Sequence, residues 1–207
     1  MRLVLSILVS AGLTYLLILS GIDWYWAKFF NEHELFVWMA VPFVLAGMAV
    51  PIIIITKFYS DWRQTRTHVA KTQFYRSFCS FAATYILMTL LKIFTNRVDM
   101  EPFEPIGLED FSNEFRFGFL NSNSWWESFS EGWPSGHTMI AIGMAIAIHP
   151  LLRNKVWRYI NIIYPVLIAL SVSTAFHWIS DVVSGAVIGI LVGLYFSKRE
   201  FKETIAS

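Results

Sequence analysis

The chain has 207 residues, of which 56% are hydrophobic, and a mean hydropathy of +0.52, so it is far more apolar than an ordinary soluble domain. Its length, and the absence of a linker, repeat or low-complexity tract, predict a single domain over residues 1–207. A net charge of only +1 argues against a nucleic-acid partner, and a lone cysteine, Cys79, excludes an intrachain disulfide.

Six apolar runs follow one another along the chain, most of them near the length of about 20 residues that crosses a membrane as a helix. They cover residues 3–22, 35–55, 77–94, 138–152, 156–176 and 178–196. The first is expected to remain as a signal-anchor, because no small-x-small cleavage pattern follows it. Pro42 and Pro51 in the second are tolerated as kinks. The sequence predicts an all-α fold, a bundle of six transmembrane helices.

Charged residues sort to opposite ends of this predicted bundle. The N-terminus and segments 57–76, 153–158 and 198–203 hold 12 of the 16 Lys and Arg residues. The segments on the other side, 23–34, 92–137 and 177–181, hold 12 of the 15 Asp and Glu residues. The positive-inside rule then predicts that both termini lie in the cytoplasm and the long middle loop lies outside. The expected location of this multi-pass protein is the cytoplasmic (inner) membrane of a bacterium. An even number of spans agrees with this orientation.

The predicted outer loop, residues 96–133, is too long to be a bare connection in a compact bundle. It carries nine aromatic residues among acidic ones: Phe103, Phe111, Phe115, Phe117, Phe119, Trp125, Trp126, Phe129 and Trp133. This pattern favours a partly helical cap in the headgroup region on the outer face. An aromatic belt with no role in substrate binding is the alternative.

Three polar pieces border the apolar runs on this outer side. Lys92 is near the end of the third run, Pro134–His137 leads into the fourth, and His177 and Asp181 lie at the corner where the fifth run gives way to the sixth. Ionisable residues at a membrane boundary are costly and usually serve function. The predicted topology brings all three pieces to one layer, which indicates chemistry on a group held at the membrane surface.

The two histidines and the aspartate are suited to attack on a phosphate ester. His177 can attack phosphorus if Asp181, one helical turn on, accepts its other ring N–H and fixes the tautomer. His137 can protonate the departing alkoxide. His33, His68 and His149 have no such neighbours and are predicted to be interfacial or loop residues.

Several further groups can bind the phosphate oxygens. The Ser135 hydroxyl and the backbone N–H groups at Gly136 and His137 lie at the predicted start of a helix, where anions bind. Lys92 and Arg97 add cationic donors, and arginine is suited to bidentate contact with phosphate.

These residues together resemble the three-part signature of the type 2 phosphatidic acid phosphatase superfamily. The resemblance covers about residues 91–189: Lys92 with Arg97, Pro134-Ser135-Gly136-His137, and His177-x3-Asp181 followed by Val-Val-Ser-Gly-Ala. It implies a six-helix membrane phosphatase that works without metal or other cofactor, through a phosphohistidine intermediate. By this resemblance the nucleophile would be His177, its partner Asp181, the acid His137, and the phosphate binders Lys92, Ser135 and Gly136.

Two of the three motifs depart from the family pattern. Asp99 and Met100 stand where the first motif has arginine and proline, and Ser171 stands where the third motif has arginine. Arg97 is the expected replacement for one arginine, and Arg116 of the cap loop is a candidate for the other. One missing donor of this kind commonly costs about 10²–10³ in rate.

The sequence therefore predicts a membrane lipid phosphatase that hydrolyses a lipid phosphate monoester or pyrophosphate at the outer, periplasmic face. Its expected partners are the bilayer and the lipid phosphate, and no pattern specifies an oligomeric state or one particular lipid. A lipid phosphotransferase with the same site, or a non-catalytic lipid-binding or transport relative, are the alternatives. A zinc site of His137, His177 and Asp181 is chemically possible but leaves Pro134–Gly136 unexplained.

Overall fold

The computed structural model describes residues 2–100, 107, 109–117 and 132–201. These ranges contain seven α-helices and one 3-10 helix, and their only β-type pairing is a single bridge between Arg97 and Phe115. The elements are α1 (Arg2–Leu19), α2 (Ile22–Asn31), α3 (Glu34–Thr65), α4 (His68–Thr95), α6 (Gly136–Ile148), η2 (His149–Leu151), α7 (Lys155–Ala175) and α8 (Ile179–Ser197). The prediction of an all-α membrane bundle is confirmed.

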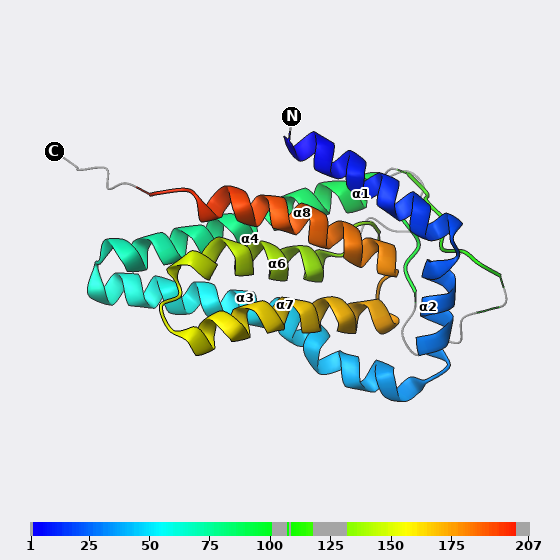
Figure 1. Cartoon of the computed structure of the whole chain (residues 1–207), viewed down its shortest axis with the longest axis horizontal. Coiled ribbons are helices and arrows are strands. Elements are labelled where there is room, and N and C mark those ends of the chain that lie inside the picture. The colour runs from blue at the N-terminus through cyan, green and yellow to red at the C-terminus, as the bar shows by residue number, and fades with distance from the viewer. Residues whose placement is uncertain (1, 101–106, 108, 118–131, 202–207) are drawn as a thin grey trace.

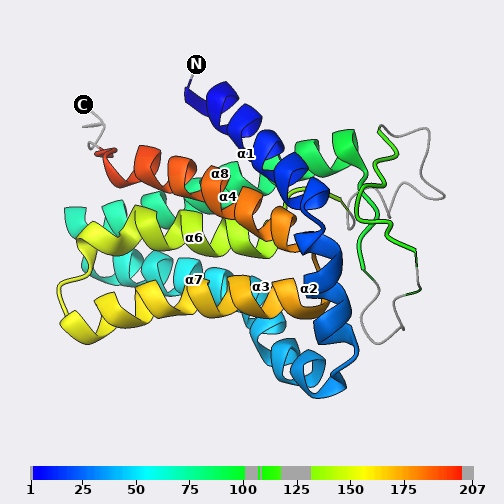
Figure 2. The same cartoon turned by 45° about the vertical axis from the view of Figure 1, so that its right-hand side comes forward.

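The long helices lie side by side along the long axis of the molecule (Figure 1). α6 runs through the middle and packs against α3, α4, α7 and α8, while α1 lies on α8. α2 crosses one end of the bundle at a steep angle to the other helices (Figure 2). That end also holds the end of α4, the start of α6 and the corner between α7 and α8.

Each of the six predicted runs falls on a helix, but the helices differ in length. By length and composition, α3, α4, α7 and α8 can each cross a membrane, and the bent pair α1–α2 makes a fifth candidate. α1 and α2 meet at an angle of 67° beside Gly21, whose φ of 74° is in the left-handed region that favours glycine. The segment 23–34, expected to be a connection, is therefore largely the helix α2.

The shortest of the six predicted runs corresponds to α6 and η2, which lie in the core of the bundle. Ten of the 13 residues of α6 are buried, and the helix is apolar on all sides. A helix that is hydrophobic all round is typical of a buried position. α6 therefore packs against protein on most of its surface.

The first cytoplasmic connection predicted from charge, residues 57–76, is mostly helical. α3 continues to Thr65 and α4 begins at His68, so a tight turn at Arg66 and Thr67 joins two long helices. Arg66 has a φ of 53°, and the Thr67 hydroxyl accepts a hydrogen bond from the Ala70 N–H, which caps α4. The charged residues of this segment indicated a connection between two spans, but charge alone does not end a helix.

α8 approaches α6 closely through a stripe of glycines, one per helical turn. A Cβ at Gly185 would lie 2.5 Å from the Ser135 carbonyl oxygen, and one at Gly189 would lie 2.7 Å from the Met139 carbonyl oxygen. The next glycine, Gly193, meets the backbone of Gly143 in the same way. Such small-residue stripes let two membrane helices bring their backbones together.

Gly185→Ala is expected to destabilise the protein and lower its activity, because the added methyl group overlaps the backbone directly before Gly136. Overpacking of this kind costs about 1–3 kcal/mol, more than the roughly 0.5–1 kcal/mol that alanine gains over glycine inside a helix. Thermal unfolding in detergent measures the change. Gly12→Ala on α1 is the matched control, since a Cβ there meets nothing within 4 Å. Equal stability of the two variants would contradict the close packing of α6 and α8.

The loop after α4 folds back onto the end of that helix where the structure describes it. Asn96 ends α4 with a φ of 40°, a conformation that asparagine tolerates. The segment 95–98 then runs antiparallel to 114–117, with the Val98 N–H donating to the Glu114 carbonyl at 3.1 Å. Phe111 packs edge-on against Trp24 and Trp178. The prediction that the cap is partly helical concerns mostly residues 101–106 and 118–131, which lie outside the described residues.

Candidate active site

The three polar pieces singled out in the sequence meet at one end of the bundle. Lys92 is in the last turn of α4, Ser135 precedes α6, and His177 lies in the corner between α7 and α8. The views in Figures 1 and 2 place these helix ends at the end of the bundle that α2 crosses. The predicted convergence of these pieces therefore holds.

The short segment before α6 is tied to three other helices. The Trp133 carbonyl accepts a hydrogen bond from the Thr95 hydroxyl at 3.0 Å, and the Trp133 indole N–H donates to Thr14 of α1 at 2.7 Å. The Ser135 N–H donates to the Asp181 carbonyl at 3.0 Å. These bonds join the Pro-Ser-Gly-His piece to α4, α1 and α8. Its backbone is therefore held beside the start of α8, next to the corner that carries His177.

The two histidines face one another across the site. Their ring centroids are 6.2 Å apart and their planes are inclined by 53°. Since a hydrogen bond to oxygen spans about 3 Å, one phosphate between the rings can contact both. His177, Lys92 and Asp99 all interact electrostatically with His137. The pair is therefore placed for a nucleophile and an acid acting on one substrate.

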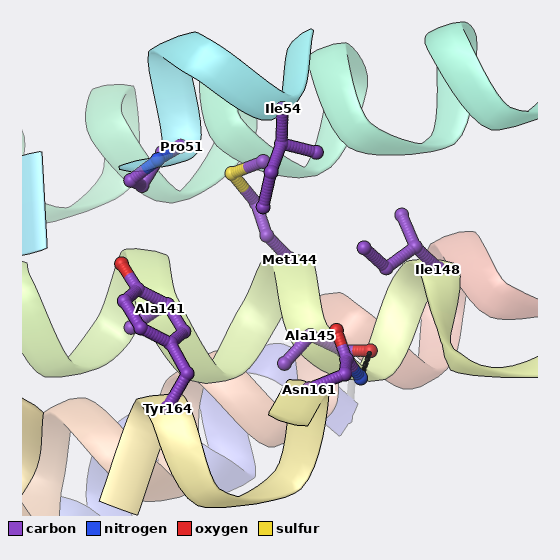
Figure 3. Close-up of a pocket in the computed structure, with 8 residues that line it drawn as sticks. All are labelled: Pro51, Ile54, Ala141, Met144, Ala145, Ile148, Asn161 and Tyr164. Carbon is purple, nitrogen blue, oxygen red and sulfur yellow. Dashed lines mark hydrogen bonds between the residues drawn. The ribbon is translucent and has the colours of Figure 1, made fainter. Parts of the chain in front are cut away.

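His137 is at the head of an apolar face of α6. A Cβ at Gly47 of α3 would lie 3.0 Å from His137 Cδ2, so glycine leaves the imidazole its space. Further along the same face an apolar pocket lies between α3, α6 and α7 (Figure 3). It is lined by Pro51, Ile54, Ala141, Met144, Ala145, Ile148, Asn161 and Tyr164. Positions 141, 144 and 148 follow His137 at helical spacing, so site and pocket share one helix face.

The carboxylate beside His177 differs from the predicted one. His177 Nδ1 lies 3.2 Å and 3.3 Å from the two carboxylate oxygens of Asp99. The Trp178 indole N–H donates to the Val98 carbonyl at 2.8 Å, which fixes the segment that carries Asp99. Asp181 is within 4.8 Å of the same pair but does not hydrogen-bond the ring. The expected bond between His177 and Asp181 is absent from the described residues, because Asp181 is turned toward Arg97.

Arg97 forms the centre of a fully buried charge network. Its Nη1 contacts the Asp181 carboxylate and the Ser180 hydroxyl, and its Nη2 lies 2.8 Å from Asp23 of α2. Its Nε and Nη2 donate to the Ser112 carbonyl. Burial alone would lower the pKa of the Arg97 guanidinium, but the Asp181 and Asp23 carboxylates outweigh this effect and raise the pKa above its ordinary value.

This network does not fit the expected role of Arg97 as a phosphate binder. All five guanidinium N–H donors are engaged by protein oxygens, and the side chain has no exposed surface. Arginine has no further donor to offer a ligand. The physical reason is the pair of carboxylates that flank Arg97, from α2 and α8, which compete with any substrate.

Asp23 is a site residue that the sequence did not single out. Its carboxylate accepts from the Ser180 N–H at 2.9 Å and from the Ser180 hydroxyl at 2.5 Å. It therefore caps the start of α8 from another helix, where a negative charge is favourable. The signal in the sequence was an acidic residue directly beside an apolar run, which the charge sorting treated only as part of a connecting segment.

The other predicted phosphate binders are brought close to the histidines or to the loop beside them. Lys92 is 4% exposed, and Ser135 is buried with its hydroxyl 3.2 Å from that of Thr138. A Cβ at Gly136 would overlap the Met88 sulfur, so a larger residue there would displace the Met88 side chain. Arg116 lies in the segment beside α4, where its N–H donates to the Asn96 carbonyl.

One group of residues at the site has the composition of a metal site. A nitrogen of His177 and one carboxylate oxygen each of Asp99 and Asp181 lie within 4.8 Å of one another. Asp181 Oδ2 is buried and has no hydrogen-bond partner among the described residues. The grouping differs from the zinc set considered from sequence, because Asp99 takes the place of His137. Imidazole with two carboxylates is an acceptable set of ligands for a divalent cation.

Comparison with known proteins gives one match. Residues 74–205, more than half of the chain, match the family described as the PAP2 superfamily. This range begins in α4 and contains every predicted site residue. No curated protein and no solved structure matched the chain.

Proposed function

We propose, because the chain belongs to the PAP2 superfamily, that it is a membrane lipid phosphatase acting through a phosphohistidine intermediate on His177. The family itself indicates phosphatase activity on phosphate esters. The observation that carries the finer proposal is the facing pair of histidines at one end of an apolar bundle, with ring centroids 6.2 Å apart.

The reaction has two steps with one bond made and one broken in each. His177 Nε2 attacks phosphorus while Nδ1 keeps its proton, and the bond from phosphorus to the lipid oxygen breaks. The departing oxygen takes a proton from His137. In the second step His137 accepts a proton from water as its oxygen attacks phosphorus, and the nitrogen–phosphorus bond breaks to release phosphate.

Three groups near the histidines supply the binding energy in this proposal. Lys92 lies close to His137 and provides positive charge for the phosphate. The start of α6, with the Ser135 hydroxyl and the Gly136 and His137 N–H groups, offers donors and the positive end of a helix dipole. A bound phosphate also favours the protonated form of His137 that the first step requires.

The exposed apolar side chains of the long helices support a lipid as the substrate, because such helices are suited to a bilayer that would surround them. A phosphate ester with an acyl or prenyl chain would be held by the same bilayer while its phosphate lies between the histidines. The charge distribution supports a site on the periplasmic face of the inner membrane.

Phosphate release from purified protein in detergent tests the proposal. Phosphatidic acid, phosphatidylglycerol phosphate, a polyprenyl pyrophosphate and water-soluble p-nitrophenyl phosphate form the panel. We expect at least one lipid to be hydrolysed with a higher kcat/KM than p-nitrophenyl phosphate, and the rate to persist in EDTA. No release from any lipid would contradict the proposal, and loss of activity in EDTA would favour a metal held by Asp99, His177 and Asp181.

His137→Ala is expected to lower the rate on lipid phosphates by about 10²–10⁴, the usual contribution of a positioned acid. The loss is expected to be much smaller with p-nitrophenyl phosphate, because nitrophenolate leaves without protonation. Comparing kcat/KM for the two substrates checks this, because kcat/KM reports the first step, whereas the second step also uses His137 and is common to both substrates. His68→Ala is the matched control, since His68 is exposed at the opposite end of α4. An equal loss of kcat/KM on both substrates would show that His137 is not the acid.

The lipid phosphotransferase remains a second candidate, since a phosphohistidine can pass its phosphoryl group to an acceptor other than water. Labelled phosphate recovered on a second lipid in the same assay would favour it. Recovery only as free phosphate would favour the hydrolase.

A further inference from the structure

Asp99 occupies a position that the family pattern gives to a phosphate-binding arginine, yet here it contacts the proposed nucleophile. Its carboxylate oxygens lie 3.2 Å and 3.3 Å from His177 Nδ1. The side chain of Asp99 is 11% exposed and that of His177 is 7% exposed, so little water reaches the pair. A carboxylate at Nδ1 holds the proton on that nitrogen and leaves Nε2 with its lone pair.

The residues on either side hold this contact in place. Val98 accepts a hydrogen bond from Trp178, so two consecutive residues of the α4 extension meet two consecutive residues of the α7–α8 corner. Trp178 is fully buried, and its ring also lies 5.6 Å from the Arg97 guanidinium. The position of Asp99 therefore follows from packing and from backbone pairing of its segment.

Asp181 is committed elsewhere by the same segment. Arg97, two residues before Asp99, draws the Asp181 carboxylate into the buried network that includes Asp23. Successive residues of an extended segment point to opposite sides, so residues two apart share a side, where Arg97 contacts Asp181 and Asp99 contacts His177. Asp181 thus pairs with Arg97, and Asp99 pairs with His177.

We propose that Asp99 is the positioning residue that orients His177 for attack, and that Asp181 serves instead to hold Arg97 and the start of α8. This inference rests on the proposed function and deepens it. Asp99 takes no proton during the reaction. It keeps the proton on Nδ1 and stabilises the positive charge that the ring acquires when Nε2 binds phosphorus.

The tautomer of His177 tests the inference without relying on activity. In ¹⁵N-histidine-labelled protein, assigned by loss of the signal in His177→Ala, we expect Nδ1 protonated and Nε2 unprotonated. Asp99→Asn is expected to move the proton toward Nε2, because the amide can donate to Nδ1. Asp181→Asn is expected to leave the tautomer unchanged. A shift in Asp181→Asn with none in Asp99→Asn would overturn the inference.

Kinetics provide the second arm. Asp99→Asn is expected to lower kcat by about 10²–10⁴, comparable to losses when the carboxylate behind a catalytic histidine is replaced. KM is expected not to rise, since a negative charge near the phosphate is removed, and Asp99→Glu is expected to recover part of kcat. A merely structural role would instead reduce the fraction of folded protein and leave kcat per folded molecule unchanged.

Glu114→Gln is the matched control, because Glu114 is an exposed acid on the segment paired with Val98. It is expected to leave both tautomer and kcat unchanged. If wild-type protein hydrolyses no lipid phosphate but the tautomer depends on Asp99, the proposed function fails while the contact stands. If wild type is active and Asp99→Asn keeps full kcat, the positioning role fails while the phosphatase stands.

Discussion

His177→Ala is expected to lower phosphate release from the best lipid substrate by roughly 10⁴-fold or more, as loss of a nucleophile does in other enzymes. Alanine cannot form the bond to phosphorus, and the site has no second nucleophile in the same place among the described residues. His137 cannot substitute, because it lies across the site with its ring centroid 6.2 Å away. The rate of phosphate release, corrected for folded protein, measures the effect.

Two controls accompany this variant. His68→Ala, at the other end of the molecule, is expected to retain the wild-type rate. The thermal unfolding temperature of His177→Ala is expected to stay near that of wild type, since the imidazole is only one of the side chains that pack in the corner between α7 and α8. If His177→Ala released phosphate as fast as wild type, the enzymatic interpretation of this site would fail.

Arg97→Ala is expected to destabilise the protein severely. Removing the guanidinium leaves the Asp23 and Asp181 carboxylates buried near each other without a cation. Breaking a buried pair in this way typically costs about 3–5 kcal/mol, because a buried charge is left uncompensated. The same change frees the end of the outer loop, since Arg97 also holds the Ser112 carbonyl. Thermal or denaturant unfolding in detergent measures the loss.

The matched control for Arg97→Ala is Lys57→Ala, which removes another cation from an ion pair. Lys57 and Asp61 are one turn apart on α3, and their side chains are 67% and 40% exposed. Exposed pairs contribute about 0–1 kcal/mol, so the control is expected to change stability little. A stable Arg97→Ala protein with a raised KM would instead support the role in phosphate binding expected from sequence.

The placement of the helices and the end of the bundle that carries the site could be predicted from the sequence. Apolar run length and charge sorting depend on local composition and on the low dielectric of the bilayer, which act on each segment separately. The runs fell on α1, α3, α4, α6, α7 and α8. The convergence of Lys92, His137 and His177 followed from alternating helix direction alone.

The pairing of charges within the site could not be predicted in the same way. Asp181 is one turn from His177, and helical spacing alone favours their contact. Arg97 and Asp99 belong to an irregular segment after α4, whose path depends on contacts with Ser112, Trp178 and α2. Long-range contacts of this kind leave no periodic signal in the sequence. That Asp99 pairs with His177, and Asp181 with Arg97, is therefore seen only in the folded chain.

This exchange of partners also changes the electrostatics of the proposed site. The site holds three carboxylates and two cations: Asp23, Asp99 and Asp181 with Lys92 and Arg97. Arg97 is already paired with Asp23 and Asp181. A phosphate dianion therefore relies on Lys92, the start of α6 and a protonated His137. Weak binding of the ground state is the expected consequence, and it leaves room for interactions that strengthen only as the reaction proceeds.

Trapping the covalent intermediate tests the central claim most directly. Wild-type protein mixed with a ³²P-labelled lipid phosphate and quenched in denaturant within one turnover is expected to carry label that is stable to base and labile to acid. Peptide mapping is expected to place this label on His177, and His177→Ala is expected to carry none. Phosphate release at the full rate with no label on His177 at any quench time would contradict the account.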